Sequence, residues 1–169
     1  SIDKKYIHIY NKIRSSHWSF FKHIKIKPLN NEIIYVSRKG GVERIKNESQ
    51  LINLMIRMNI YVLSPNFKSF MFDVDQYINC RVMIGIEGTN LHNTLFMKKN
   101  NDCHVINIAS NRDGCVKKYG YTYNQELCNS LSMVKMHVIP FKEVLPDTNI
   151  YDIDFIEKEL TEILTSLKN

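Results

Sequence analysis

One segment near the middle of the chain reads Val82-Met-Ile-Gly-Ile-Glu-Gly-Thr-Asn-Leu-His-Asn-Thr-Leu-Phe96. Its first three residues form a short apolar run of the kind that a strand buried on both faces requires, and we expect that strand to end at Gly85. Apolar residues then recur at helical spacing, and either Thr89 or Asn90 would cap the helix by accepting a hydrogen bond from its free amides. The segment therefore predicts a strand, a Gly-x-x-Gly turn and a helix.

Such a junction is suited to binding an anion. Several backbone N–H groups and the positive end of the helix would point at one place, and Gly88 would let a ligand approach without a side chain in the way. A phosphate is the expected anion. The spacing alone fits a purely structural turn about equally well, because any tight strand-to-helix connection can use two glycines.

Length and composition favour one main domain. The chain has 169 residues, of which 44% are hydrophobic and 24% are charged, so it can bury one substantial core. No apolar run approaches the roughly 20 residues that a membrane helix needs, and the N-terminus lacks a signal-peptide core. We expect a cytoplasmic location, with peripheral association at a membrane as the alternative. A chain that begins at Ser1 also suggests a piece of a longer protein.

The four cysteines include no C-x-x-C pair, and a domain of this size needs no disulfides. Reduced thiols are the simplest interpretation. A zinc site formed by Cys103, His104, Cys115 and Cys128 would have an unusual ligand spacing, so we favour buried thiols.

The whole chain has a formal net charge of +6, and basic residues are concentrated in its first part. A nucleic acid, an anionic membrane surface or a phosphorylated small molecule would each explain this charge. The early basic residues are Lys4, Lys5, Arg14, Lys22, Lys25, Lys27, Arg38, Lys39, Arg44 and Lys46.

Strand and helix patterns alternate about five times without hairpin signals. We expect strands at 33–36, 60–63, 82–84, 104–108 and 136–141, and helices at 2–14, 48–58, 70–79, from 90 onward, 124–135 and 154–167. Residues 109–120 look irregular, and Pro140 would require either that the last strand lies at an edge of the sheet or that the proline lies at the end of the strand. The pattern predicts an α/β fold with a mostly parallel sheet covered by helices on both faces. Residues 1–29 would be a helix and linker that pack on a domain formed by residues 30–169.

Ligands of such sheets bind outside the carboxyl ends of the strands, where the connection order reverses. Two loops fit that description, one at 37–41 after the first strand and one at 85–90 after the third. We expect these two loops to lie side by side.

Four segments of the chain occur in a characteristic order. Ile34-Tyr-Val-Ser-Arg38 is followed by Glu43-Arg-Ile-Lys-Asn-Glu48 and Leu51, then by the segment 82–96, and finally by Tyr151-x-Ile-Asp154 before the last helix. Together they resemble the patterns hydrophobic-S-R … R-x-x-N-E-x-x-L and G-P-H/E-G-S/A-x-L-x-N-x-L-F of family 61 glycosyltransferases and the related capsular-polysaccharide enzymes. The resemblance covers about residues 30 to 168, and two motifs in order are more specific than one glycine pair.

The resemblance implies an inverting, metal-independent glycosyltransferase used in making a polysaccharide or glycoconjugate. Enzymes of this kind have a GT-B architecture of two Rossmann-like domains, of which this chain would be the C-terminal, donor-binding half. The donor is expected to be a nucleotide sugar, commonly a UDP-sugar, and no cofactor is required. A glycan or glycoconjugate acceptor would bind to a missing N-terminal domain or a partner subunit, which would also supply the general base.

On the same resemblance, Arg38 would reach the diphosphate, and backbone amides around Gly88 would cradle it. Arg44, Asn47 and Glu48 would order the first loop or touch the donor. A guanidinium and a helix N-terminus in one crevice already suggest a diphosphate leaving group. The full set of expected donor-binding residues is Ser37, Arg38, Arg44, Asn47, Glu48, Gly85, Glu87, Gly88, Thr89, Asn90 and Asn93, with Arg38 and Glu87 as the catalytic candidates.

Glu87 departs from the family pattern, because many relatives carry His at this position. A carboxylate beside a diphosphate would repel it unless the carboxylate is turned away or protonated. Glu87 would alternatively accept a hydrogen bond from a sugar hydroxyl or hold a loop amide.

Other candidate motifs have simpler interpretations. The two D-x-D sequences, Asp73-Val-Asp75 and Asp152-Ile-Asp154, fall inside a predicted helix and at a predicted helix cap, so we expect no metal there. We interpret Arg112, Lys117 and Lys118 as a solvated loop, with phosphate contact as the alternative, and Tyr119, Tyr121 and Tyr123 as loop packing rather than a base or sugar platform.

Two other functions remain open. One is a non-catalytic Rossmann-like module whose basic face binds an anionic partner such as a nucleic acid, and the other is an inactive transferase retained as a scaffold.

Overall fold

The computed structural model describes residues 32–38, 45–65, 70–97, 102–112 and 115–167. The expected helix at 2–14, the linker to residue 29, and Arg44 lie outside these ranges. So do most of the early basic residues, of which Arg38 and Lys46 are described.

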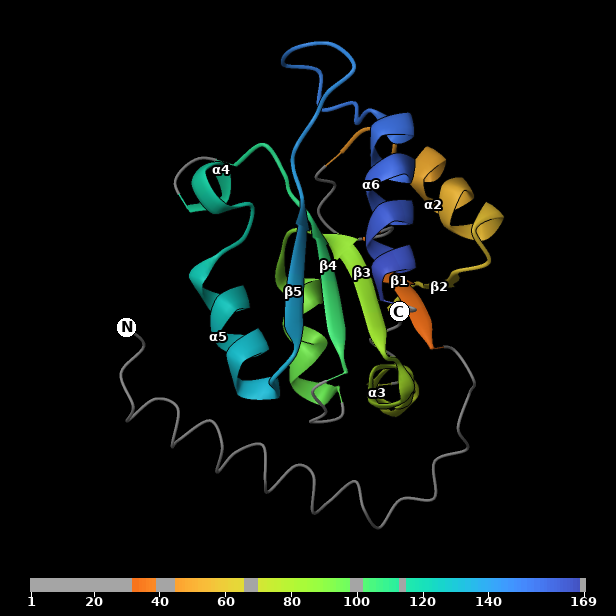
Figure 1. The fold of residues 1–169 in the computed structure, drawn as a ribbon, viewed down its shortest axis with the longest axis vertical. Helices are drawn as coiled ribbons and strands as arrows, with labels where there is room; N and C mark the ends of the chain where they lie inside the picture. Colours follow the sequence, from red (N-terminus) through yellow and green to blue (C-terminus); the bar gives the residue numbers. More distant parts are fainter. Residues whose placement is uncertain (1–31, 39–44, 66–69, 98–101, 113–114, 168–169) are drawn as a thin grey trace.

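The described part of the chain forms one sheet of five parallel strands in the order β2-β1-β3-β4-β5. The strands are β1 (Ile33–Val36), β2 (Tyr61–Leu63), β3 (Val82–Ile86), β4 (His104–Ile108) and β5 (Lys135–Ile139). All four neighbouring pairs are parallel, which confirms the predicted Rossmann-like α/β fold (Figure 1). β5 is an edge strand that ends before Pro140, as expected.

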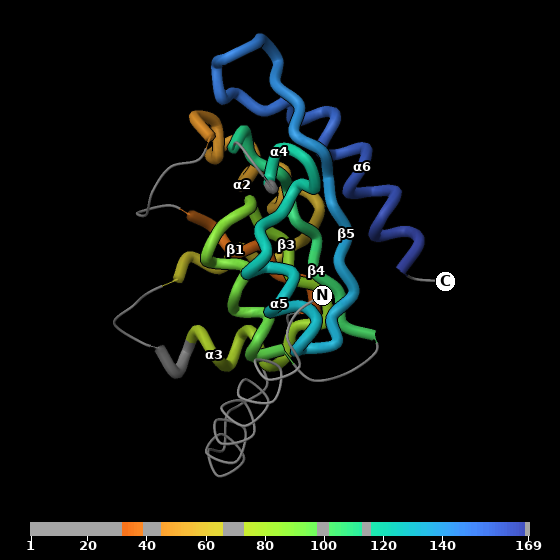
Figure 2. The backbone as a smooth tube through the Cα atoms, turned by 90° about the vertical axis from the view of Figure 1, so that its left-hand side faces the viewer, coloured from red at the N-terminus to blue at the C-terminus, as the bar shows by residue number. Residues whose placement is uncertain are grey.

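Helices cover both faces of this sheet (Figures 1 and 2). The helices are α2 (Glu48–Arg57), α3 (Phe70–Asn79), the 3₁₀ helix η1 (Thr89–Phe96), α4 (Cys115–Tyr119), α5 (Tyr123–Ser132) and α6 (Ile153–Ser166). α2 and α6 pack on one face, whereas α3 and η1 pack on the other. Figure 2 shows α5 and α6 on opposite sides of β5.

Alternation along the strands divides the core into two layers. In β1, Tyr35 faces the α2 and α6 layer, and its neighbours Ile34 and Val36 face the α3 and η1 layer. All three are fully buried, because a parallel sheet covered on both faces needs apolar side chains in both directions.

The strand β3 is longer than predicted. β3 continues through Gly85 to Ile86, because Gly85 pairs with Val36 on one side and Asn107 on the other. A Cβ at Gly85 would lie 2.8 Å from Cδ2 of Leu91, so this glycine allows the following helix to pack closely on the strand.

The helix after β3 is a 3₁₀ helix rather than an α-helix, and neither Thr89 nor Asn90 caps it. Its N-cap is Gly88, with no side-chain hydrogen bond to the free amides. The Asn90 amide instead donates to Ser37 O at 3.1 Å, a contact between loops that periodicity along the sequence does not reveal.

The segment 109–120 is not irregular throughout, because α4 occupies Cys115–Tyr119. A helix of five residues is too short to show apolar periodicity. α5 ends at Ser132, earlier than expected, since Met133 adopts a left-handed conformation and β5 begins at Lys135.

Asp152 caps α6 as predicted, and its carboxylate accepts from the Phe155 amide at 3.0 Å.

Three cysteines, Cys80, Cys103 and Cys128, are free and buried, which confirms the expected thiols at these positions. Within the described ranges, no helix combines the length and the apolar character needed to cross a membrane.

Candidate functional site

The loops after β1 and β3 meet at the carboxyl edge of the sheet. These strands are neighbours, but the chain leaves β1 toward β2 and leaves β3 toward β4, so the connection order reverses between them. This position is the switch point of the sheet. Asn90 joins the two loops through Ser37 O, and Arg38 Nη1 donates to Glu87 O at 3.4 Å. The predicted side-by-side placement of the two loops is confirmed for the described residues.

The guanidinium of Arg38 lies against the backbone of Gly88. A Cβ added at Gly88 would overlap Arg38 Nη1. Gly88 also has φ of 144° and ψ of −175°, a conformation essentially restricted to glycine. The close approach of Arg38 to this turn therefore depends on the absence of a side chain at residue 88.

Glu48 organises the loop that carries Arg38. Its Oε1 accepts from the Arg38 amide at 2.7 Å and from the Tyr35 hydroxyl at 3.0 Å. Burial, with the nearby Glu48 carboxylate as a second cause, raises the pKa of Tyr35 well above its ordinary value, so this hydroxyl remains a donor. Glu48 thus orders the first loop, one of the two roles expected from the sequence.

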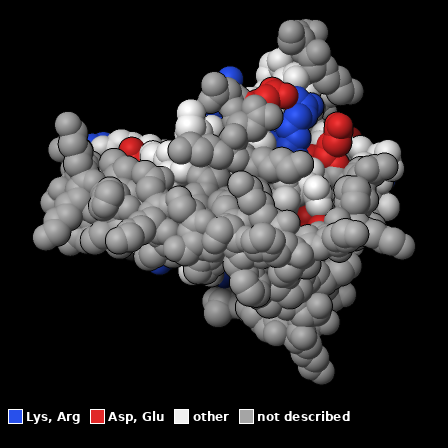
Figure 3. Space-filling view, turned by 90° about the horizontal axis from the view of Figure 1, so that it is seen from below, with Lys and Arg blue, Asp and Glu red and all other residues white. Residues whose placement is uncertain are grey.

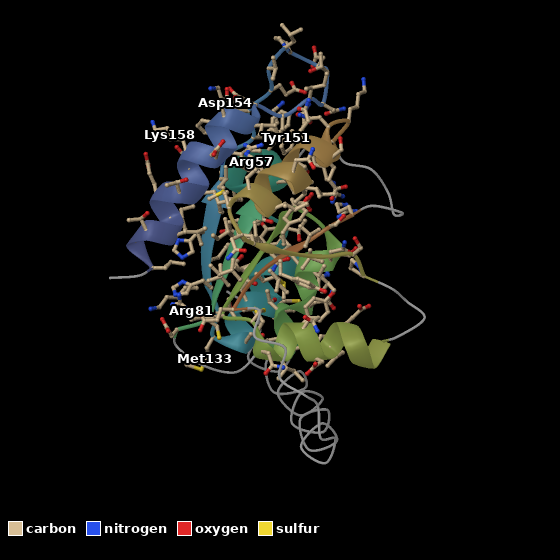
Figure 4. The ribbon with its side chains drawn as sticks, turned by 90° about the vertical axis from the view of Figure 1, so that its right-hand side faces the viewer. Arg57, Arg81, Met133, Tyr151, Asp154 and Lys158 are labelled. Carbon is tan, nitrogen blue, oxygen red and sulfur yellow. The ribbon has the colours of Figure 1, made fainter. Side chains whose placement is uncertain are left out.

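Asn47 joins this loop to the segment before α6. Its Nδ2 donates to Tyr151 O at 3.0 Å, and its Oδ1 accepts from the Tyr151 amide at 2.9 Å. The Tyr151 hydroxyl donates to Ala109 O at 2.5 Å, directly after β4. Tyr151 lies between α2 and α6 (Figure 4), so these contacts connect three distant segments at the carboxyl edge.

Glu87 is turned into the protein. Its side chain is 1% exposed, Ser110 Oγ donates to Oε2 at 2.8 Å, and Arg112 Nη1 lies 3.2 Å from Oε1. Sequence reasoning missed Ser110 and treated Arg112 as a solvated loop residue. Both follow β4, so the rule that ligands bind at the carboxyl ends of strands was the signal that could have found them.

Comparison with known families shows the family to which this chain belongs. The sequence model of Glycosyltransferase 61 matches residues 5–106, more than half of the chain. The chain belongs to glycosyltransferase family 61. A search of curated proteins finds no match. Family membership indicates glycosyl transfer as the class of activity, with a nucleotide sugar and a glycan acceptor as the general substrates.

The family 61 match spans β1 to the start of β4 and therefore includes Arg38, Glu48 and Gly88. It ends before Ser110, Arg112 and Tyr151. The family match thus includes both loops after β1 and β3, whereas the structure adds Ser110 and Arg112, which follow β4.

A cavity of about 410 Å³ lies beside the switch point. Ser110, which donates to Glu87, also lines this cavity. The rest of its wall comes from the segment after β4, from α4 and from β5, and is formed by Ala109, Asn111, Val116, Lys117, Lys118, Tyr119, Gly120, Val138, Pro140 and Phe141. Lys117 and Lys118 are accordingly close to the candidate site, rather than on a remote loop.

The other expected site residues lie in β3 and η1, around the Gly88 turn. Asn93 donates to Asn90 O at 2.9 Å and to the Tyr77 hydroxyl at 3.2 Å, so it braces η1 against α3. Thr89 is exposed beside Gly88, and Gly85 lies within β3. Burial lowers the pKa of His92, which keeps its imidazole neutral at neutral pH.

Neither D-x-D sequence forms a metal cluster in the described ranges, where no group of three or more suitable ligands occurs. Asn79 donates to Asp75 within α3. Asp152 pairs with Lys142 at 2.8 Å, and this contact lowers the pKa of its carboxyl group.

At the opposite end of the molecule, the charged side chains that the structure describes are of both signs. Figure 3 views that end from below, and the described Lys, Arg, Asp and Glu side chains visible there lie beside one another. This visible part of the surface does not present a patch of one sign.

Proposed function

We propose that this chain is the nucleotide-sugar-binding domain of an inverting family 61 glycosyltransferase. The donor diphosphate would bind in the crevice between the loops after β1 and β3, and the sugar would pass to a glycan or glycoconjugate acceptor. The observation that carries the proposal is the Arg38 guanidinium against the backbone of Gly88, at the point of a parallel sheet where the connection order reverses.

The geometry suits a diphosphate leaving group. Negative charge develops on the diphosphate oxygens as the glycosidic bond breaks, and fixed donors placed there stabilise the transition state. Arg38 is 7% exposed, and its loop is fixed by Glu48, so its guanidinium needs little reorganisation. Arg38 and the backbone amides after Gly88 would together perform the role that a metal ion performs in other transferases.

We assign Glu87 to positioning rather than to proton transfer. Both carboxylate oxygens accept contacts, from Ser110 and from Arg112, and the side chain is buried. The general base would come from the acceptor-binding half of the enzyme or from a partner subunit.

A thermal-shift panel of UDP, GDP, CDP and dTDP tests the proposal. A ligand that binds only the folded state raises the melting temperature, and at about 100 times its Kd it adds about 2.7 kcal/mol of stability. We expect one nucleoside diphosphate to stabilise the chain, and Arg38→Ala to weaken its binding by about tenfold or more. Arg57→Ala is the matched control, because Arg57 pairs with Glu157 on the exposed surface of α2 and α6.

Failure of every nucleotide to stabilise the chain would contradict the proposal. Salt-sensitive binding of a polyanion in the same experiment would instead favour a non-catalytic module with a basic face.

A further inference from the structure

We propose that Arg112 is a second guanidinium contact to the donor diphosphate, oriented by Glu87. This inference rests on the proposed function and adds a binding residue that lies beyond the family match, which ends at residue 106.

Two guanidinium groups converge on Glu87. Arg38 Nη1 donates to its carbonyl oxygen at 3.4 Å, and Arg112 Nη1 lies 3.2 Å from its carboxylate. The next residue is Gly88, which has no side chain and against whose backbone the Arg38 guanidinium lies. Arg112 therefore reaches the same turn as Arg38, from the loop after β4.

The exposure of Arg112 fits a ligand contact. A guanidinium carries five N–H donors, and the contact with Glu87 uses one nitrogen. The Arg112 side chain is 45% exposed, whereas the Glu87 side chain is 1% exposed. The ion pair thus fixes one side of the guanidinium while the group remains accessible.

The local charges also leave room for an anion. A buried carboxylate needs a compensating charge, and Arg112 together with the Ser110 hydroxyl provides it. Arg38 adds a second positive charge beside the same residue, while the nearby Glu48 carboxylate is held by the Arg38 amide and the Tyr35 hydroxyl. A diphosphate placed there would meet an attractive site despite Glu87, which removes the repulsion expected from the sequence.

The competing explanation is that Arg112 only neutralises Glu87. The two explanations differ in what happens when Glu87 loses its charge. If Arg112 only neutralises Glu87, Arg112→Ala weakens diphosphate binding in the native background, because it leaves the Glu87 carboxylate uncompensated. In a Glu87→Gln background the same substitution would not weaken binding.

A double-mutant cycle separates them. Calorimetry would measure the Kd of the wild type, R112A, E87Q and E87Q/R112A for whichever of UDP, GDP, CDP or dTDP binds the wild type. R57A serves as the control, and urea unfolding of each variant measures stability separately.

We expect R112A to weaken binding about tenfold, and E87Q/R112A to be weaker than E87Q by a similar factor, as for a lost charge-assisted hydrogen bond. R112K should recover part of the affinity, because it keeps the charge without the planar fork. If R112A does not fold, the comparison of R112K with R112Q replaces it.

A loss that disappears in the E87Q background, or no loss in R112A, would overturn the inference while leaving the proposed function intact. Absence of nucleotide binding by the wild type would instead overturn the proposed function and the inference with it.

Discussion

The two ends of the sheet each carry a polar cluster, but the clusters differ in construction. At the carboxyl edge, Arg38, Glu87 and Arg112 come from the loops after three strands, β1, β3 and β4. Toward the amino edge, His104 Nδ1 lies 3.0 Å from His137 Nε2, and Asp102 Oδ1 lies 3.7 Å from His104 Nε2.

The cluster toward the amino edge is largely self-contained. Arg81 pairs with Asp102 at 3.5 Å and also donates to Leu167 O, so it lies by the end of α6 (Figure 4). Burial lowers the pKa of both histidines, and in His137 the neighbouring His104 lowers it further. These groups mainly satisfy one another and join strands β4 and β5.

The difference shows how a parallel sheet separates binding from stability. Loops after the strands bring cations and a glycine turn to one edge of the sheet, whereas residues at the strand starts pair across the ladder. Four predictions, in order of decreasing effect, test whether the two ends behave differently.

Gly88→Ala should have the largest effect on nucleotide affinity, because the new Cβ would overlap the Arg38 guanidinium and an alanine would be strained at this φ. We expect nucleoside diphosphate affinity to fall roughly 100-fold, and stability to fall by about 1–3 kcal/mol. Calorimetry and urea unfolding measure the two effects. The stability cost should shrink in an Arg38→Ala background, and an unchanged cost there would show that the overlap with Arg38 is not its source.

Asn47→Ala should destabilise the scaffold of the carboxyl edge. It removes both hydrogen bonds to the buried Tyr151 backbone, at a cost of about 2–4 kcal/mol in urea unfolding. Asn79→Ala is the matched control, because its amide contacts only Asp75 within α3, and we expect it to cost less than about 1 kcal/mol. Equal costs would argue against Asn47 as a link between distant segments.

Acidification should weaken the cluster toward the amino edge. The pKa values of His104 and His137 are lowered in the folded state, so below about pH 6.5 the unfolded chain binds protons that the folded chain does not. Their contribution to stability is therefore fully present above pH 6.5 and is lost as the pH falls toward the folded values.

Urea unfolding between pH 7.5 and 5 measures this loss. His137→Gln should reduce the pH dependence, since one titrating ring is removed, while the charged neighbours Asp102, Arg81 and Lys135 remain. If His137→Gln has the same pH dependence of stability as the wild type, the His137 ring is not a source of that dependence. Nucleotide affinity at pH 7.5 should not change.

Arg57→Ala should have the smallest effect. Arg57 and Glu157 form an ion pair of 3.2 Å with exposed side chains, 59% and 44%, so stability should change by less than about 1 kcal/mol. Nucleotide affinity should stay within experimental error of the wild type. A large loss of affinity would mean that binding responds to any change in surface charge, and would remove the contrast between the two ends.

Much of the fold could be predicted from local patterns. The bounds of β1, α3 and β4 agree with expectation, and Asp152 caps α6 as predicted. Departures occur where a contact from elsewhere decides the conformation: Gly85 stays within β3 because it pairs on both sides, and Asn90 binds Ser37 instead of capping η1.

The candidate site was predictable only in part. Arg38 and Gly88 each follow a predicted strand, and the rule for parallel sheets places such loops at the same edge. The same rule points to the segment after β4, but it does not say that Ser110 and Arg112 contact the Glu87 carboxylate, because that contact depends on how the two loops pack.

The sequence by itself determined the alternation of strands and helices, the parallel sheet and the family, because apolar periodicity, glycine breaks and short motifs are local properties of the chain. Tertiary structure alone decided which polar and charged groups meet. The contact between Glu87 and Arg112 spans 25 residues, and that between Asn47 and Tyr151 spans 104. Such pairs depend on how the loops pack over the sheet, and that packing is set by the whole core rather than by any one segment.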